Sequence, residues 1–240
     1  MIWSGVELYR VTGRRGYLLD AIATARAVDR LLADGRGIFA GLQAENDVVE
    51  PLVEGMYVLA TAGEAAFART WIVRNAAAAL SSRNADGVFG RFFDGPPPAT
   101  TSTAWQSNGG LALEIAAAAL DPGGTAATNA WATARLVRRQ IAAPGSLTFH
   151  GAGIALLGTL GELCCEPGHA RVLLDGAETF DGTGIWQNKS SSGRSIDGTV
   201  LFAWRWPRTG THTLRFESGI ANAKEGGSFL HLESYLVLGT

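Results

Sequence analysis

Three acidic residues between positions 47 and 54 have the spacing that places side chains on one face of a helix. Asp47, Glu50 and Glu54 follow one another at intervals of three and four residues, which separate neighbours on a helix surface. Cleavage of a glycosidic bond needs two carboxyl groups flanking that bond, so Asp47 and Glu50 are the candidate catalytic residues. The structural alternative is that Asp47 caps a helix, Glu50 completes the capping box and Glu54 is solvated.

Two further clusters combine a tryptophan with amide side chains. They are Trp105, Gln106 and Asn108 where a proline-rich loop meets a helix, and Trp186, Gln187 and Asn188 before a serine-rich loop. An indole face can stack on a sugar ring while amides bond its hydroxyl groups. Both clusters are therefore candidate carbohydrate-binding residues. The alternatives are that Trp105 closes the loop onto the helix and that Trp186 is a rim residue of an edge strand.

The sequence predicts neither a metal site nor a cofactor. Cys164 and Cys165 are adjacent, which matches neither a disulfide between them nor the ligand spacing of zinc sites. The chain also lacks a His-Glu-x-x-His helix, a phosphate-binding glycine loop and a Gly-x-Ser-x-Gly elbow. These absences disfavour metalloprotease, nucleotide-binding and esterase functions.

The composition of the chain excludes some classes of binding partner. The chain has 240 residues, 47% of them apolar, and a formal net charge of -2, so we expect no binding to nucleic acid or to an anionic membrane surface. Apolar runs are shorter than the roughly 18 residues that a membrane-spanning helix needs. Neither a signal peptide nor an oligomeric state is indicated.

The candidate residues of the first half are positioned by a repeated helical hairpin. Small-residue helices stop near Gly13, Gly63 and Gly123, and Trp71 and Trp131 occupy equivalent places that we expect in the core. Apolar spacing predicts helices over 2–12, 16–33, 47 onward, 64–82, 103–120 and 124–142. Hairpins of this length must stack or close into a ring to bury their apolar faces.

After Pro144 the pattern becomes β. Short strands are predicted over 147–150, 153–160, 170–175, 184–187, 199–206, 212–216 and 229–238, with hairpin turns at 175–176 and 208–210. Trp204 and Trp206 share one face, which we expect to be core. This spacing is typical of an antiparallel β-sandwich of jelly-roll type. We therefore predict a multidomain α-then-β chain, with a helical array at 1–143 and a β-sandwich at 146–240.

Several motifs of the helical part are similar to those of a known group. They are the helix end Leu8-Tyr-Arg-Val-Thr-Gly13, the helix Asn75-Ala-Ala and the loop Gly87-Val-Phe-Gly90. Together they resemble the hairpins of (α/α)6-toroid glycoside hydrolases, and among these glycoside hydrolase family 76, the endo-α-1,6-mannanases. The resemblance covers residues 1–142. It implies three of the six hairpins of a toroid, followed by an accessory sandwich module.

The resemblance implies a polysaccharide or oligosaccharide partner of α-mannan type and, for a longer parent protein, secretion. The family's catalysis rests on two consecutive aspartates, whereas no two acidic residues are adjacent in this chain. We therefore expect the C-terminal portion of such a hydrolase, truncated at its N-terminus and without the catalytic pair. Two alternatives stay open: a non-catalytic glycan-binding or surface-interaction protein, and a toroid of another sugar-active family.

Overall fold

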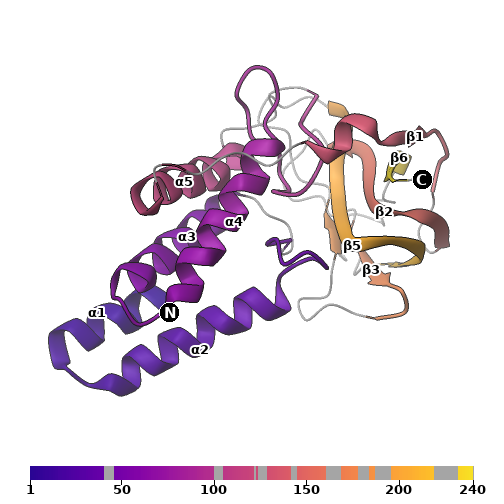
Figure 1. Ribbon diagram of the computed structural model, residues 1–240. Coiled ribbons are helices and arrows are strands. Elements are labelled where there is room, and N and C mark those ends of the chain that lie inside the picture. Colours follow the sequence, from indigo (N-terminus) through magenta and orange to yellow (C-terminus); the bar gives the residue numbers. More distant parts are fainter. Residues whose placement is uncertain are drawn as a thin grey trace, which may run out of the picture.

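The helices lie at one end of the molecule and the β-sheet at the other in the computed structural model (Figure 1). The structure describes residues 1–40, 46–99, 105–121, 123, 129–141, 145–160, 169–177, 184–186, 196–218 and 232–239. Helices plus an antiparallel sheet agree with the α-then-β class that the sequence predicts.

The five α-helices of the described residues form two layers. They are α1 (Ile2–Thr12), α2 (Arg15–Leu31), α3 (Asn46–Thr61), α4 (Ala66–Ser81) and α5 (Trp105–Leu120). Helices α1, α3 and α5 form a row, because α3 contacts both of the others. Helix α2 contacts α1 and α3, and α4 contacts α3 and α5. One side of the row is therefore covered by α2 and α4.

Glycine turns set the hairpins, as the sequence predicts. Gly13 ends α1 in the left-handed conformation with φ 69°, and its N–H donates to the carbonyl oxygen of Tyr9. Gly63 has φ 84° between α3 and α4. This region of backbone space disfavours residues with a Cβ atom. Gly5 has a different role, because a methyl group there would lie 2.8 Å from the carbonyl oxygen of Tyr17 and separate α1 from α2.

One apolar core joins the helices and the loop that follows α4. Trp71 is buried in it as expected, with Phe39 packed edge-on against its ring at 6.2 Å and Phe93 nearby. Asn75 is fully buried and satisfies two backbone groups, accepting from Phe39 N–H at 2.7 Å and donating to the Trp71 carbonyl at 2.8 Å. The bond from Phe39 fixes the segment after α2 onto α4.

The described strands form one six-stranded antiparallel sheet in the order β1-β6-β2-β5-β3-β4. They are β1 (Arg135–Val137), β2 (Gly145–Leu160), β3 (His169–Leu174), β4 (Gly184–Trp186), β5 (Ile196–Ser218) and β6 (Leu232–Leu238). Trp204 and Trp206 are partly buried and both pack against its core, as expected, but the opposite face of β5 is covered too, because Ala203 is buried with Trp131 and Phe92.

One of the two predicted hairpin turns is confirmed and the other is wrong. Asp175 and Gly176 both have positive φ, 52° and 77°, in a tight turn after β3. At 208–210 the chain does not reverse, and β5 runs through as one strand. Gly210 pairs with Gly151 and Arg205 pairs with Gly153, so the residues between form a bulge rather than a turn.

The helix predicted at 124–142 is wrong in its described part. Residues Ala130–Thr133 form a 3₁₀ turn, and Arg135–Val137 pair with β6. Asn129 accepts a hydrogen bond from Trp131 N–H at 3.0 Å, a local bond that competes with helix formation. Trp131 is buried as expected, but it packs against the sheet residues Ala155 and Ala203. The described helices are thus two hairpins and a fifth helix.

Candidate functional site

A groove of about 420 Å³ lies between α3 and α5, two neighbours in the row of helices. Its lining residues from α3 are Glu50, Val53, Glu54 and Tyr57, and those from α5 are Asn108, Leu111, Ala112, Ile115, Ala116 and Ala119. Both sets repeat at three and four residues, so each helix presents one continuous stripe to the groove.

The α3 wall combines a buried floor with an acidic rim. Val53 is 1% exposed and lies in the helical core, whereas Glu50 and Glu54 are exposed. The two carboxylates are one turn apart on α3, where neighbouring side chains are about 5–6 Å apart at Cβ. Tyr57 lies a further turn along, partly buried against the core, and brings a phenol ring with a hydroxyl group.

The α5 wall is mainly apolar, and its alanines are what leave the groove open. Ala112, Ala116 and Ala119 carry side chains too short to fill the space beside α3. Leu111 and Ile115, one turn apart, form the outer rim and are 50% and 64% exposed. The half-buried Asn108 adds an amide with two donors and one acceptor.

This arrangement suits binding of a polyhydroxylated ligand better than cleavage of one. Carboxylate and amide groups can hold hydroxyl groups, while the apolar rim covers the carbon face of a ring. Cleavage would need carboxyl groups on both sides of the scissile bond, one of them an acid whose pKa is raised by its environment. Glu50 and Glu54 stand on the same wall and both are exposed.

Some of the residues that line this groove were predicted as site residues from the sequence. Glu50 and Glu54 share a face, as the spacing predicted, and Asn108 lies across from them. Asp47 lies inside the first turn of α3, which begins at Asn46, so the helix starts one residue before the expected cap. Trp105 and Gln106 are the first two residues of α5. The side chains of Asp47, Trp105 and Gln106 lie outside the described residues.

The second predicted carbohydrate cluster is not part of this groove. Trp186 ends the edge strand β4, where it pairs with His169 of β3, and its side chain lies outside the described part of the chain. Gln187 and Asn188 lie outside the described residues altogether. The two predicted clusters therefore belong to different halves of the molecule, and the role of Trp186 stays a prediction.

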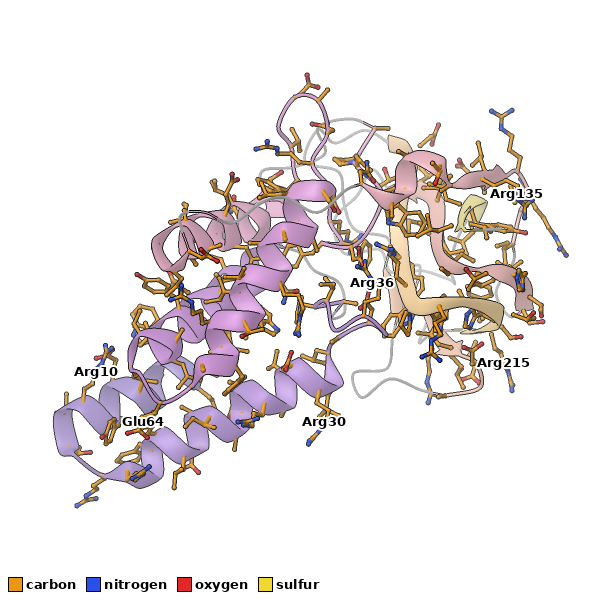
Figure 2. All side chains as sticks on the ribbon, viewed as in Figure 1. Arg10, Arg30, Arg36, Glu64, Arg135 and Arg215 are labelled. Carbon is orange, nitrogen blue, oxygen red and sulfur yellow. The ribbon has the colours of Figure 1, made fainter. Side chains whose placement is uncertain are left out.

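A buried polar cluster at the contact between helices and sheet was missed by the sequence analysis. Asp94 binds two arginines, Arg36 at 2.8 Å and Arg205 of β5 at 2.6 Å. Asp34 lies beside Asp94 and accepts from the backbone N–H groups of Arg36 at 2.8 Å and Ile38 at 3.0 Å. Figure 2 shows Arg36 between the helices and the sheet.

Burial is the main reason why Asp34 is perturbed. Asp34 is 7% exposed and Asp94 9%. Desolvation, together with the negative charge of Asp94 and a hydrogen bond between the two carboxyl groups, raises the pKa of Asp34 to about 7. No signal in the sequence could have found this cluster, because its members come from three segments that only the fold brings together.

Comparisons with known proteins identify no family for the chain. No family model matches it, and no curated protein matches its sequence. Within the described residues no group of three or more His, Cys, Asp or Glu side chains could hold a metal ion. Within the same part of the chain, no helix has both the length and the apolarity needed to span a bilayer.

Proposed function

We propose that the chain is carbohydrate-active and binds an oligosaccharide of α-mannan type in the groove between α3 and α5. The observation that carries the proposal is the composition of the groove walls. Glu50, Glu54 and Asn108 offer hydrogen-bonding groups to sugar hydroxyls, and Leu111 and Ile115 offer an apolar surface to ring faces. Few precisely placed polar groups on an apolar lining are typical of small-ligand sites.

The proposal extends to architecture. The helices would belong to an (α/α)6-type toroid, in which the row α1, α3 and α5 forms part of the inner wall. The sheet would belong to a jelly-roll-like sandwich that serves as an accessory module. Both suggestions rest on the motif resemblance and on the two-layered arrangement of the helices.

We assign binding, not bond cleavage, to this chain alone. Among the lining residues that the structure describes, those of α5 bring no carboxyl group into the groove, so none of them is a general acid facing Glu50 or Glu54 across a bound sugar. The chain would therefore act either as the C-terminal portion of a glycoside hydrolase or as a non-catalytic glycan-binding protein. The resemblance favours the hydrolase, and the groove serves both.

Calorimetric titration of the full chain with α-1,6-linked manno-oligosaccharides tests the proposal. Replacing Asn108 by Leu keeps the side-chain volume but removes the amide, and Glu54→Gln removes a charge. A hydrogen bond to a charged group contributes about 1.5–3 kcal/mol and a neutral one about 1 kcal/mol. Because the amide of Gln still accepts a hydrogen bond, we expect Glu54→Gln to lose the difference, about 0.5–2 kcal/mol, which weakens binding roughly 2- to 30-fold. Asn108→Leu should cost about 1 kcal/mol, because it removes a neutral hydrogen bond.

Glu64→Gln is the matched control, because Glu64 lies after α3 and pairs with the exposed Arg15 at 3.3 Å, outside the groove. It should leave affinity unchanged. The proposal fails if the chain binds no manno-oligosaccharide, or if all three variants bind as the parent does. Release of reducing ends from α-1,6-mannan should stay at background, and robust turnover lost in Glu50→Gln would assign catalysis to Glu50 instead.

A further inference from the structure

The segment after α2 and the loop after α4 both contact the sheet. Gly35, just after α2, donates its N–H to the carbonyl oxygen of Arg205 on β5 at 3.1 Å. The loop after α4 brings Asp94, whose carbonyl accepts from Trp131 Nε1 at 2.8 Å. Phe92 of the same loop packs edge-on against Phe202 of β5. Thus the acidic pair lies at the point where both helical segments meet the sheet.

We propose that Asp34 and Asp94 share a proton, and that its loss weakens the contact between the segment after α2 and strand β5. The pair is a pH-responsive latch between the helical part and the sheet. The inference does not depend on the carbohydrate groove, because the latch residues are not among those that line it.

The uneven distribution of partners decides which carboxyl group holds the proton. Both guanidinium groups in the cluster, those of Arg36 and Arg205, bind Asp94. Asp34 instead receives two backbone N–H groups, which stabilise a carboxylate less than a cation does. Asp34 is therefore the group that keeps the proton and donates it to Asp94.

Other charged groups around the segment do not remove this asymmetry. They are Arg36 on the same segment, Arg91 on the loop of Asp94, Arg205 on β5, and Arg74 with its partner Asp29 on the neighbouring helices. Arg74 lies against Gly37, but its guanidinium binds Asp29 at 2.5 Å. Arg91 is buried and has interactions of its own.

The direction of the pH effect follows from the raised pKa. The folded chain holds the Asp34 proton up to a pH of about 7, whereas the ordinary value is 3.8. Between these limits the folded state binds more protons than the unfolded state, so its stability falls as the pH rises. The loss is complete at about pH 7, where Asp34 ionises in the folded chain as well. The buried site then holds two adjacent carboxylates, and their repulsion weakens the neighbouring contact of Gly35 with β5.

Carbon NMR on the full-length, ¹³C-labelled chain measures the latch directly. The carboxyl carbon of Asp34 should titrate with a midpoint near pH 7. After correction for the intrinsic rate, the Gly35 amide should lose protection from hydrogen exchange as the pH rises from 5 toward this midpoint. The loss should approach tenfold per pH unit below the midpoint and level off above it. An Asp34 midpoint in the ordinary carboxyl range overturns the proposal, whatever the variants do.

Asp34→Asn separates the latch from other pH effects, because the amide resembles the protonated acid and can still donate to Asp94. The variant should keep constant Gly35 protection between pH 5 and 8, whereas the parent loses protection over this range. Asp86→Asn is the control, since Asp86 is exposed in the turn after α4, and it should respond to pH as the parent does. Unchanged pH dependence in Asp34→Asn refutes the proposal, and so does its loss in Asp86→Asn.

Discussion

Two glycines in helices give opposite expectations for the same substitution, Gly16→Ala and Gly110→Ala. On helix propensity alone each change should stabilise the chain by about 0.5–1 kcal/mol, because glycine loses more backbone entropy on folding. The structure separates them. A methyl group at Gly16 in α2 meets nothing within 4 Å, whereas one at Gly110 in α5 would lie 2.4 Å from Cγ of Phe89.

Phe89 cannot easily move away from a new methyl group. It is 5% exposed within the helical core, and its carbonyl oxygen accepts a hydrogen bond from Ser107 of α5 at 3.5 Å. The guanidinium of Arg83 lies over its ring. Overpacking of a buried site costs about 1–3 kcal/mol, which exceeds the gain in helix propensity. We expect Gly110→Ala to lower the free energy of unfolding by about 1–2 kcal/mol, and Gly16→Ala to raise it by about 0.5 kcal/mol.

Urea unfolding followed by far-ultraviolet circular dichroism measures both changes on the full chain. The double variant Phe89→Leu with Gly110→Ala adds a cycle, because the smaller side chain leaves room for the methyl group. It should lose less stability than the sum of the two single variants, as contacting residues do. Equal stabilisation by Gly16→Ala and Gly110→Ala would refute the packing of Phe89 on α5.

Two further predictions concern the hairpins and the helical core, and both are measured by the same urea unfolding. Gly13→Ala should lower the free energy of unfolding by about 1–2 kcal/mol, because φ is 69° at this position. Gly13→Asn should lower it less, since asparagine tolerates this conformation. Equal losses in the two variants would contradict the role of backbone conformation. Asn75→Ala should cost about 1–3 kcal/mol, because the buried N–H of Phe39 loses its acceptor. The exposed Thr70→Ala on the same helix should stay within about 0.5 kcal/mol, and a similar loss in both would contradict the assignment to Asn75.

Local signals in the sequence account for most of the helices. Apolar spacing and a glycine stop predict α1 over the same residues that form it, and the predicted bounds of α4 and α5 differ from the observed ones by two residues at most. The same reasoning wrongly predicts a helix over 124–142. Trp131 does not continue the helical repeat but packs between the loop after α4 and the sheet. Tertiary packing overrides the helical pattern at this point, and periodicity cannot reveal it.

The candidate site residues that the sequence could predict are those that belong to one helix. Glu50 and Glu54 can be placed on one face from their spacing, because both belong to α3, and the groove confirms it. Residues from distant segments that come into contact only in the folded chain cannot be paired from their spacing. Asp94 binds Arg205, which is 111 positions later in the chain, and neither residue belongs to a motif. Asp34, whose pKa is raised to about 7, therefore lies where the sequence offers no guide.

Alanine-rich helices explain how the chain combines a tight core with an open groove. Small side chains let α4 pack against both α3 and α5 on one side of the row, where Ala76 and Ala79 are buried. In the groove the same composition leaves Ala112, Ala116 and Ala119 too short to fill the space beside α3. Any helix covering the groove would have to satisfy Glu50 and Glu54 with polar or basic groups, because burying an unpaired carboxylate is costly. A hydroxyl-rich ligand satisfies those groups without the ordering of a further helix, which is why we favour a sugar as the occupant of the groove.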